Sequence, residues 1–212
     1  MFITFEGVEG CGKSTQIQRV HAWLQAKGQR VLLSREPGGT GIGRTIRGLL
    51  LDAANNHLCA RTELFLYLAD RAQHVQEVIQ PALNMGIIVL VDRFVDSTLV
   101  YQGFGRGLDL QVLRDLNRLA VQGQYPDLTL LLDVPAEIGL TRARCRNGEQ
   151  GTSMAEGRFE AESLDFHHRI REGYLHLVAS DPDRILRIDA TPDEQTVFEA
   201  VQREVQSRIL LP

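Results

Sequence analysis

The residues best suited to chemistry form a phosphate-loop pattern, G-x-x-x-x-G-K-[ST], near the start of the chain. Backbone N–H groups on such a loop point toward an anion, and the start of the following helix adds positive potential. We expect Lys13 to neutralise the β- and γ-phosphates and the Ser14 hydroxyl to bind Mg²⁺. The sequence therefore predicts a nucleoside triphosphate site made of Gly7, Val8, Glu9, Gly10, Cys11, Gly12, Lys13, Ser14 and Thr15.

Glu9 is unexpected in this loop, because a carboxylate inside a phosphate cradle would repel the ligand unless it points away. If it points away, it could accept a hydrogen bond from a sugar hydroxyl or hold an arginine in place. The plainer interpretation is an exposed loop residue.

Charged residues also follow two apolar runs that have the character of buried strands. Asp92 and Arg93 follow one of them, which suits Asp92 to the magnesium shell and Arg93 to a second phosphate. An ion pair at the strand end is the alternative. Arg35–Thr40 (REPGGT) follows the other, and Pro37 before two glycines predicts a sharp turn that admits a cis bond.

Helical spacing brings further candidates together. Arg44 and Arg47 are three residues apart and share a helix face, so they could clamp a phosphate monoester; a solvated face is the alternative. Tyr67 and Arg71 are one turn apart, so a ring and a guanidinium could together support a nucleobase. Ordinary surface packing of this pair is the competing interpretation.

The segment Asn147–Gly157 (NGEQGTSMAEG) is polar, rich in glycine and weakly patterned. A solvated surface loop would have this composition. In a protein that binds a triphosphate, however, a mobile lid that brings arginines over the transferring phosphate is the stronger hypothesis. The arginines that flank the segment are Arg142, Arg144, Arg146 and Arg158.

Strand-like runs alternate with helical stretches along the whole chain, and several runs are apolar on both faces. This pattern predicts an α/β fold with a parallel sheet covered by helices on both sides, and ligands at the carboxyl ends of the strands. The predicted strands are Met1–Glu6, Val31–Ser34, Ile87–Val91, Leu128–Asp133 and Ile185–Asp189. The predicted helices are Ser14–Lys27, Gly41–Leu51, Thr62–Met85, Asp109–Gly123, Ala136–Arg146, Arg158–Ala179 and Pro192–Ile209.

Composition limits the classes of function. At 212 residues the chain suits one domain, and its net charge of −4 argues against a broad surface for nucleic acid or membrane. All basic residues except Lys13 and Lys27 are arginines, which bind phosphate oxygens with two donors at once. The three cysteines lack metal-type spacing, and we see neither a signal peptide nor a membrane-spanning run. We therefore expect a cytoplasmic protein.

Taken together, the motifs resemble those of bacterial thymidylate kinases, in the same order and through essentially the whole chain. The resemblance implies a P-loop NTPase three-layer sandwich with five parallel strands and a small lid at about 144–158, in a single domain covering 1–212. It also implies Mg²⁺-dependent transfer of a phosphoryl group from ATP to dTMP, and a homodimer. The motifs are GVEGCGKS, REPGGT, LADR, DRFVDST, YQGFGRG, LLLDV and RFE.

The resemblance further implies roles for individual residues. Lys13 and Ser14 would serve ATP and Mg²⁺, with Asp92 close to the metal. Three arginines would surround the acceptor phosphate, Tyr67 would stack on thymine, and Arg71 would bond to the base. The residues so implied around dTMP are Glu9, Arg35, Pro37, Arg47, Tyr67, Arg71, Arg93, Ser97, Tyr101 and Gln102.

Two positions depart from the family pattern. The stacking position is usually Phe but is Tyr67 here, so its hydroxyl needs a partner or water. Gly10 stands where some relatives place a catalytic arginine. The missing charge would then come from the lid, and of its arginines we favour Arg146 and Arg158 as catalytic residues beside Lys13 and Arg93.

The implied chemistry needs no general base, because an acceptor phosphate with a second pKa of about 6 is already largely a dianion. The difficulty is to bring two anions together, which calls for positive charge and exclusion of water. Three alternatives stay open on the residues alone: another small-molecule kinase of this fold, a nucleotide-dependent switch, and, least favoured by the acidic balance, an ATPase that binds nucleic acid.

Overall fold

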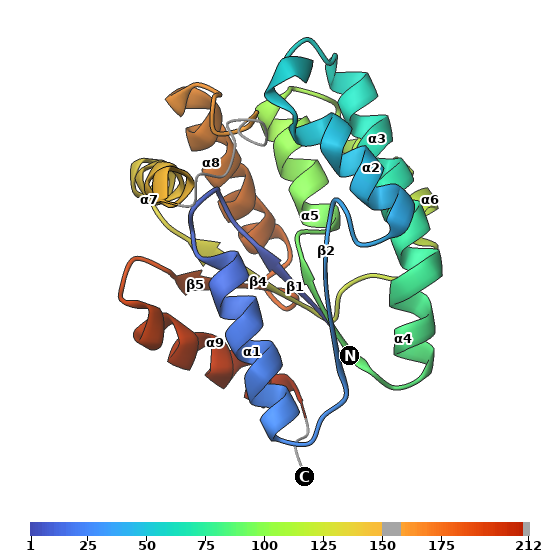
Figure 1. The fold of residues 1–212 in the computed structure, drawn as a ribbon, viewed down its shortest axis with the longest axis vertical. Helices are drawn as coiled ribbons and strands as arrows, with labels where there is room; N and C mark the ends of the chain where they lie inside the picture. The colour runs from blue at the N-terminus through green and yellow to red at the C-terminus, as the bar shows by residue number, and fades with distance from the viewer. Residues whose placement is uncertain (150–157, 210–212) are drawn as a thin grey trace.

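Five short strands form one parallel sheet (Figure 1), and the strands in its centre are apolar. The computed structural model describes residues 1–149 and 158–209, without the side chains of residues 146–149. The strands lie in the order β2-β3-β1-β4-β5, and each neighbouring pair is parallel. Their bounds are β1 Phe2–Glu6, β2 Val31–Arg35, β3 Ile88–Asp92, β4 Leu128–Asp133 and β5 Ile185–Asp189. All five predicted strands are confirmed, to within one residue at each end.

The central strands are apolar on both faces because both faces are covered. Every residue of β1 and β4 is buried, whereas β2, at one edge of the sheet, has only partly buried or exposed residues. Register places Phe2 opposite Val89 on one side of β1 and Ile3 opposite Leu128 on the other. Side chains alternate between the faces of β1, so that Phe2 joins one core cluster and Ile3 and Phe5 join the other. The phosphate loop therefore leaves the sheet from a central strand with a neighbour on each side.

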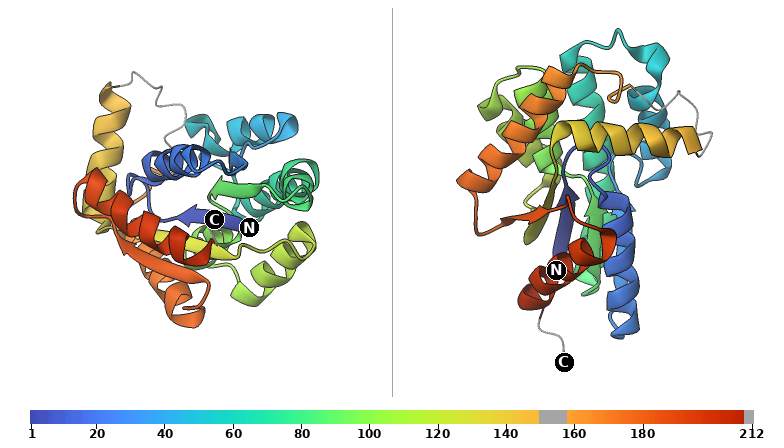
Figure 2. Two further views of the ribbon diagram at one scale, coloured as in Figure 1. Left: turned by 90° about the horizontal axis from the view of Figure 1, so that it is seen from below. Right: turned by 90° about the vertical axis from the view of Figure 1, so that its left-hand side faces the viewer.

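Helices complete the three layers of the predicted P-loop NTPase arrangement. Helices α1 and α9 pack together against one face, and α4, α6 and α8 cover the other, while α3 packs between α2 and α6 (Figure 2). The longer helices are α1 Lys13–Ala26, α2 Gly41–Leu51, α3 Ala60–His74, α6 Leu110–Val121, α7 Ala136–Glu149, α8 Leu164–Ser180 and α9 Glu194–Arg208. The short ones are α4 Gln80–Asn84 and α5 Val95–Thr98, with a 3₁₀ turn at Ala53–Asn55.

Two predicted helices differ from the observed ones at particular points. The stretch Thr62–Met85 is not one regular helix, because a π-helical turn, Val75–Ile79, separates α3 from α4. Pro81 lacks an N–H group and would collide with a carbonyl one turn earlier in a regular helix, so the wider turn relieves it. The helix predicted from Arg158 begins only at Leu164, because the Ser163 side chain caps it by accepting from Phe166 N.

A helical segment after β3 was missed by the sequence prediction. Helix α5 continues into a π-helical stretch, Leu99–Gly105, whose glycines argue against a helix. The packing explains them. A Cβ atom at Gly103 would lie 2.5 Å from Leu110 Cδ2, and one at Gly105 would lie 2.7 Å from Phe166 Cε2. These glycines let the segment lie directly against α6 and α8, which positions its polar side chains beside the sheet edge.

Parallel strands bring their carboxyl ends to one edge of the sheet, and the candidate residues gather there. The phosphate loop follows β1, the REPGGT turn follows β2, and Asp92 ends β3. Among the described residues, no helix is both long enough and apolar enough to cross a membrane.

Candidate active site

The phosphate loop joins β1 to α1 and needs glycine for close packing. Gly10 has a φ of 68°, and a Cβ atom there would lie only 2.0 Å from the carbonyl oxygen of Gly139 on α7. Helix α7 therefore crosses the loop at a distance that admits no side chain. This contact accounts for one departure noted in the sequence: an arginine at position 10 would require α7 to move.

Lys13 begins α1 and lies over its own loop. Its Nζ atom donates hydrogen bonds to Gly7 O at 3.0 Å and to Val8 O at 2.9 Å, with Cys11 Sγ at 3.4 Å. The side chain is largely buried yet lines the pocket described below. An ammonium held on the concave side of a phosphate loop is placed to neutralise phosphate oxygens.

Ser14 and Asp92 are the two oxygen donors suited to a magnesium ion. Ser14 Oγ donates to Asp92 Oδ2 at 3.1 Å, although the two residues belong to different strand–helix units. Among the described residues no three His, Cys, Asp or Glu side chains form a metal cluster. The pair nevertheless fits Mg²⁺, which keeps several waters and uses one or two protein ligands together with substrate phosphates.

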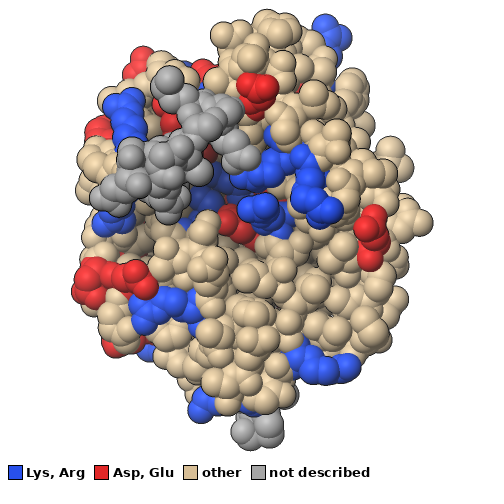
Figure 3. Space-filling view, viewed as in Figure 1, with Lys and Arg blue, Asp and Glu red and all other residues tan. Residues whose placement is uncertain are grey.

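One pocket of about 1170 Å³ extends from the phosphate loop to α3 and the π-helical stretch. Positive side chains surround this hollow in Figure 3, on a molecule whose net charge is negative. Its lining includes all ten side chains implied around the acceptor, Glu9, Arg35, Pro37, Arg47, Tyr67, Arg71, Arg93, Ser97, Tyr101 and Gln102, together with Lys13, Ser14 and Asp92. The structure thus brings together residues from four separate parts of the chain.

Arg93 lines this pocket and has an unusual backbone conformation. Its φ is 68°, in the left-handed region that residues with a side chain rarely adopt. Its guanidinium donates to Glu9 Oε1 at 3.0 Å and to Ser97 Oγ and Tyr174 Oη, each at 3.2 Å. Strained residues of this kind are retained where the surrounding structure fixes them, often at functional sites.

Glu6 is the residue that fixes this turn. Its Oε1 accepts the Phe94 N–H at 2.8 Å, and its Oε2 accepts the hydroxyls of Ser97 at 2.6 Å and Tyr174 at 2.7 Å. The carboxyl is fully buried, and burial together with nearby Asp96 raises its pKa. Glu6 therefore ties the end of β1 to the turn that carries Arg93.

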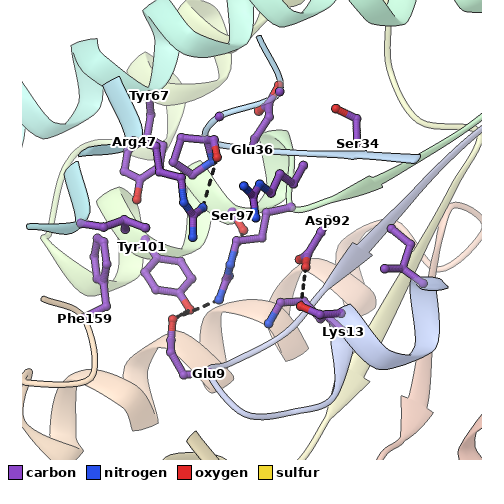
Figure 4. A pocket seen from close by; sticks show the side chains of 18 of the residues that line it. Glu9, Lys13, Ser34, Glu36, Arg47, Tyr67, Asp92, Ser97, Tyr101 and Phe159 are labelled. Atoms are coloured by element: carbon purple, nitrogen blue, oxygen red, sulfur yellow. Dashed lines mark hydrogen bonds and ion pairs between the residues drawn. The ribbon is translucent and has the colours of Figure 1, made fainter. Parts of the chain in front are cut away.

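The Glu9 carboxylate turns toward Tyr101, as Figure 4 shows, and holds Arg93. Tyr101 Oη donates to Glu9 Oε1 at 2.6 Å, and His167 Nδ1 lies 3.4 Å from Oε2. Burial opposes ionisation, but His167, Arg93 and Lys13 outweigh it and hold the pKa of Glu9 far below its ordinary value. Of the two roles considered for a Glu9 side chain that points away from the phosphate cradle, these contacts show the one in which it holds an arginine in place.

Arg71 is buried, so the surface-packing interpretation of the Tyr67–Arg71 pair is wrong for the arginine. Its Nε donates to Glu36 Oε2 at 2.8 Å and its Nη2 to Phe94 O at 2.9 Å. Its Nη1 donates to Thr98 Oγ1 at 2.7 Å and to Asn117 Oδ1 at 2.6 Å. These bonds fix the guanidinium at the far end of the pocket, where Tyr67 also lines the wall.

The two arginines of α2 lie in different environments, so they do not form the phosphate clamp that their spacing suggested. Arg47 lines the pocket and donates to Pro37 O at 3.2 Å, whereas Arg44 is exposed and lies outside the lining. The Glu36–Pro37 bond is cis, which the sequence admitted. Helix α3 also fixes the REPGGT turn, because Asp70 Oδ1 on that helix accepts the Gly38 N–H at 3.0 Å.

The arginines around the expected lid have different environments. Arg158 is buried behind the pocket, paired with Glu63, and donates to Leu50 O at 3.0 Å. Arg142 donates to Ala190 O at 2.8 Å and Thr191 O at 3.0 Å, beside the loop after β5. The side chain of Arg146 and residues 150–157 lie outside the described residues.

Several contributors to this site carried little signal in the sequence. Glu6 was noticeable only as a polar residue at a strand end. Tyr174 and His167 lie on α8, far along the chain from the motifs, and only the folded arrangement places them against Glu6 and Glu9. Glu63, one turn before Tyr67 on α3, could have been noticed because it precedes that pair on the same face.

Known proteins of one family are similar to this chain over nearly its whole length. The family model described as thymidylate kinase matches residues 5–201. A thymidylate kinase of Nitratidesulfovibrio vulgaris (strain Miyazaki F) is 58% identical over 212 residues, covering 100% of this chain and 99% of that protein. A thymidylate kinase of Trichlorobacter lovleyi is 56% identical over 212 residues, covering 100% of both. The crystal structure of thymidylate kinase from Ehrlichia chaffeensis has a TM-score of 0.77 and 32% identity, covering 97% of this chain and 98% of that one.

Proposed function

Because this chain belongs to the thymidylate kinase family, we propose that the pocket described above holds ATP over the phosphate loop and dTMP between Arg93 and α3. The reaction is transfer of the γ-phosphoryl group of ATP to dTMP, which gives dTDP. The observation that carries the proposed arrangement is the continuity of the pocket: one cavity is lined by Lys13, by Arg93, and by Tyr67 with Arg71.

Charge neutralisation is the main task of the protein in this arrangement. The dTMP phosphate is largely a dianion at neutral pH and already nucleophilic, so a general base is not required. Lys13 lies at the donor phosphates and Arg93 at the acceptor phosphate, so that the two anions can meet in line. Ser14 and Asp92 would hold Mg²⁺, which supplies further positive charge to the donor phosphates when bound.

The sugar of dTMP is assigned to the space beside Glu9 and Tyr101. The two side chains are bonded to each other at 2.6 Å, so the tyrosine ring is held at a fixed position against the pocket. Glu9 has an acceptor oxygen for the 3′-hydroxyl, and the Tyr101 ring crowds the 2′ position, which favours deoxyribose. Arg35 and Arg47, both in the lining, complete the charge around the acceptor phosphate.

The base is assigned to the end of the pocket formed by Tyr67, Arg71, Ser97 and Gln102. Tyr67 supplies a flat face for stacking, and burial raises the pKa of its hydroxyl, which therefore stays neutral. Arg71 and Gln102 supply polar groups for the edge of the ring. Ser97 acts chiefly through Glu6, to which its hydroxyl is bonded at 2.6 Å.

A lid at about 144–158 stays part of the proposal, in one domain that covers the whole chain. Arg158 is the one of its two proposed catalytic arginines whose side chain the structure describes, and it is engaged with Glu63 behind the pocket. A catalytic role for Arg158 would therefore require it to exchange Glu63 for the transferring phosphate. Arg146 is the other proposed donor of positive charge.

We also propose that two copies of the chain associate through α3 and α6. These helices pack together, and their outer faces carry exposed apolar side chains: Phe65 is 58% exposed, Val112 53% and Leu119 75%. Apolar residues gathered on one face are typical of an interface between subunits. Analytical ultracentrifugation of the wild type and of Leu119→Glu would test this: a dimer that the variant converts to monomer is expected.

The cytoplasm is the compartment we propose for this activity. All three cysteines are free, and two of them, Cys59 and Cys145, are exposed. Exposed free thiols are usual in a reducing compartment.

The assay that tests the function directly uses purified protein, ATP, Mg²⁺ and one monophosphate at a time: dTMP, dUMP, dCMP or dGMP. Anion-exchange chromatography then identifies which one becomes a diphosphate. The proposal expects dTDP to form with the highest kcat/KM. A higher kcat/KM with one of the other three acceptors would contradict the assignment of the base site.

A further inference from the structure

A buried carboxylate lies directly behind the base end of the pocket. Glu63 of α3 is fully buried and is not part of the lining, whereas Gln102, on the π-helical stretch Leu99–Gly105, is part of it. The amide nitrogen Nε2 of Gln102 donates to Glu63 Oε1 at 2.7 Å. The two side chains meet although they are 39 positions apart in the sequence.

Two arginines lie beside Glu63 and pair with its carboxylate. Arg106 approaches with Nε at 3.4 Å from Oε1 and Nη2 at 3.3 Å from Oε2, and Arg158 pairs with Oε2. A carboxylate can only accept hydrogen bonds. The Gln102 amide must therefore turn its NH₂ group toward Glu63, since its carbonyl oxygen would meet another acceptor there.

With the NH₂ group committed, the other end of the amide is fixed as well. Its carbonyl oxygen Oε1 faces away from Glu63, and no donor in the described part of the chain bonds to it. Ordinarily an Asn or Gln side chain can turn over and offer either a donor or an acceptor to a ligand. Gln102 therefore presents a hydrogen-bond acceptor, its Oε1 atom, to the pocket.

We propose that Glu63 is a positioning residue that sets selection of the base by fixing the orientation of the Gln102 amide. The ring nitrogen N3 carries a hydrogen in thymine and uracil but is an unprotonated acceptor in cytosine. An Oε1 atom fixed toward the base therefore accepts a hydrogen bond from the N3–H of thymine or uracil. With cytosine it would face another acceptor and stay unpaired, which weakens binding of that base. This inference rests on the proposed placement of the base against Gln102.

The test compares how strongly dTMP and dCMP compete for the pocket in wild-type protein and in Glu63→Gln. The substituted side chain keeps its size but can donate as well as accept, so the Gln102 amide is free to turn over. KM for dTMP and the inhibition constant of dCMP against dTMP phosphorylation are measured, because the latter needs no turnover of dCMP. We expect the preference for dTMP over dCMP to fall by about tenfold or more, with KM for ATP unchanged.

Two companion variants separate orientation from structural support. Arg106→Gln removes a partner of Glu63 but leaves its contact with Gln102, so the preference for dTMP should persist. Glu63→Asp withdraws the carboxylate by one methylene and should lower the preference in the same direction as Glu63→Gln; it decides the matter if Glu63→Gln does not fold. An unchanged preference in the folded Glu63 variants would overturn the inference.

Gln102→Leu distinguishes a failure of this inference from a failure of the proposed site. If that variant keeps the full preference for dTMP, the base does not lie against Gln102 and the proposed placement is wrong. If it loses the preference while Glu63→Gln keeps it, the placement holds and the orienting role of Glu63 is wrong.

Discussion

The guanidinium of Arg93 lies 3.0 Å from the carboxylate of Glu9, which pairs the residue after β3 with a residue of the phosphate loop. The pair links the part of the pocket proposed for the donor to the part proposed for the acceptor. Arg93 is held there in a strained conformation, with a φ of 68°. An arginine fixed in this way needs little reorganisation when charge develops on the transferring group.

Replacing Arg93 with alanine should therefore affect the chemical step more than ATP binding. We expect kcat for dTMP phosphorylation to fall by about 10³-fold or more, with KM for ATP changed little. Steady-state kinetics with each substrate varied in turn would measure both. Arg44→Ala is the matched control, because Arg44 is exposed and outside the lining. Near-normal kcat for Arg93→Ala at saturating substrates would refute the role.

Substitution of Gly10 should disturb both folding and the phosphate loop. In Gly10→Ala the new Cβ atom would meet the Gly139 carbonyl oxygen, and the backbone would stay at a φ of 68°. We expect a lower Tm and a higher KM for ATP. Gly48→Ala is the control: it is helical, meets nothing within 4 Å, and should be neutral or stabilising by about 0.5–1 kcal/mol. Equal Tm values for wild type and Gly10→Ala would exclude the steric argument.

Removing the charge of Asp92 should weaken the response to magnesium. In the wild type the Ser14 hydroxyl lies 3.1 Å from an Asp92 carboxylate oxygen. Asp92→Asn keeps an oxygen acceptor for that hydroxyl but removes the negative charge that would attract a cation. The Mg²⁺ concentration that gives half the maximal rate should rise. Calorimetric titration of ATP with and without Mg²⁺ would give an independent measure. Asp115→Asn, an exposed site on α6, serves as the control. Identical magnesium requirements in all three proteins would count against Asp92 as a ligand.

Asp70 should make stability depend on pH. Burial and the nearby Glu36 charge raise its pKa from 3.8 to about 6. The folded protein therefore binds a proton that the unfolded chain releases, so stability is full below pH 4 and is lost as pH rises toward 6. The full loss is roughly 3 kcal/mol.

Urea unfolding of wild type and Asp70→Asn at several pH values would isolate this effect, because other titrating groups are common to both proteins. The difference between their free energies of unfolding should change between pH 4 and 6 and be constant above pH 7. A difference that is the same at every pH would show that Asp70 titrates normally.

The sequence was sufficient for the sheet because apolar runs with polar ends leave few choices. It was also sufficient to name many of the side chains that line the pocket, because most of these belong to short motifs, at strand ends or, for Tyr67 and Arg71, on α3. It could not reveal the helical turn at Leu99–Gly105, whose glycines are explained only by contacts with Leu110 and Phe166.

The supporting residues were hidden for a related reason. Glu6 and Tyr174 are 168 positions apart, and Glu63 and Gln102 are 39 apart. Their pairing depends on how α3, α8 and the π-helical stretch pack, and no local pattern encodes it. The grouping of residues into motifs was therefore predictable, whereas the hydrogen bonds that orient them required the fold.

The most direct test of the account is a crystal structure of the protein with dTMP and a non-hydrolysable ATP analogue bound together. The account predicts the dTMP phosphate within hydrogen-bond distance of Arg93, the terminal phosphate of the analogue beside Lys13, and the attacking oxygen in line with the bond to be broken. If the dTMP phosphate lies away from Arg93, with the two phosphates not aligned, the account is wrong.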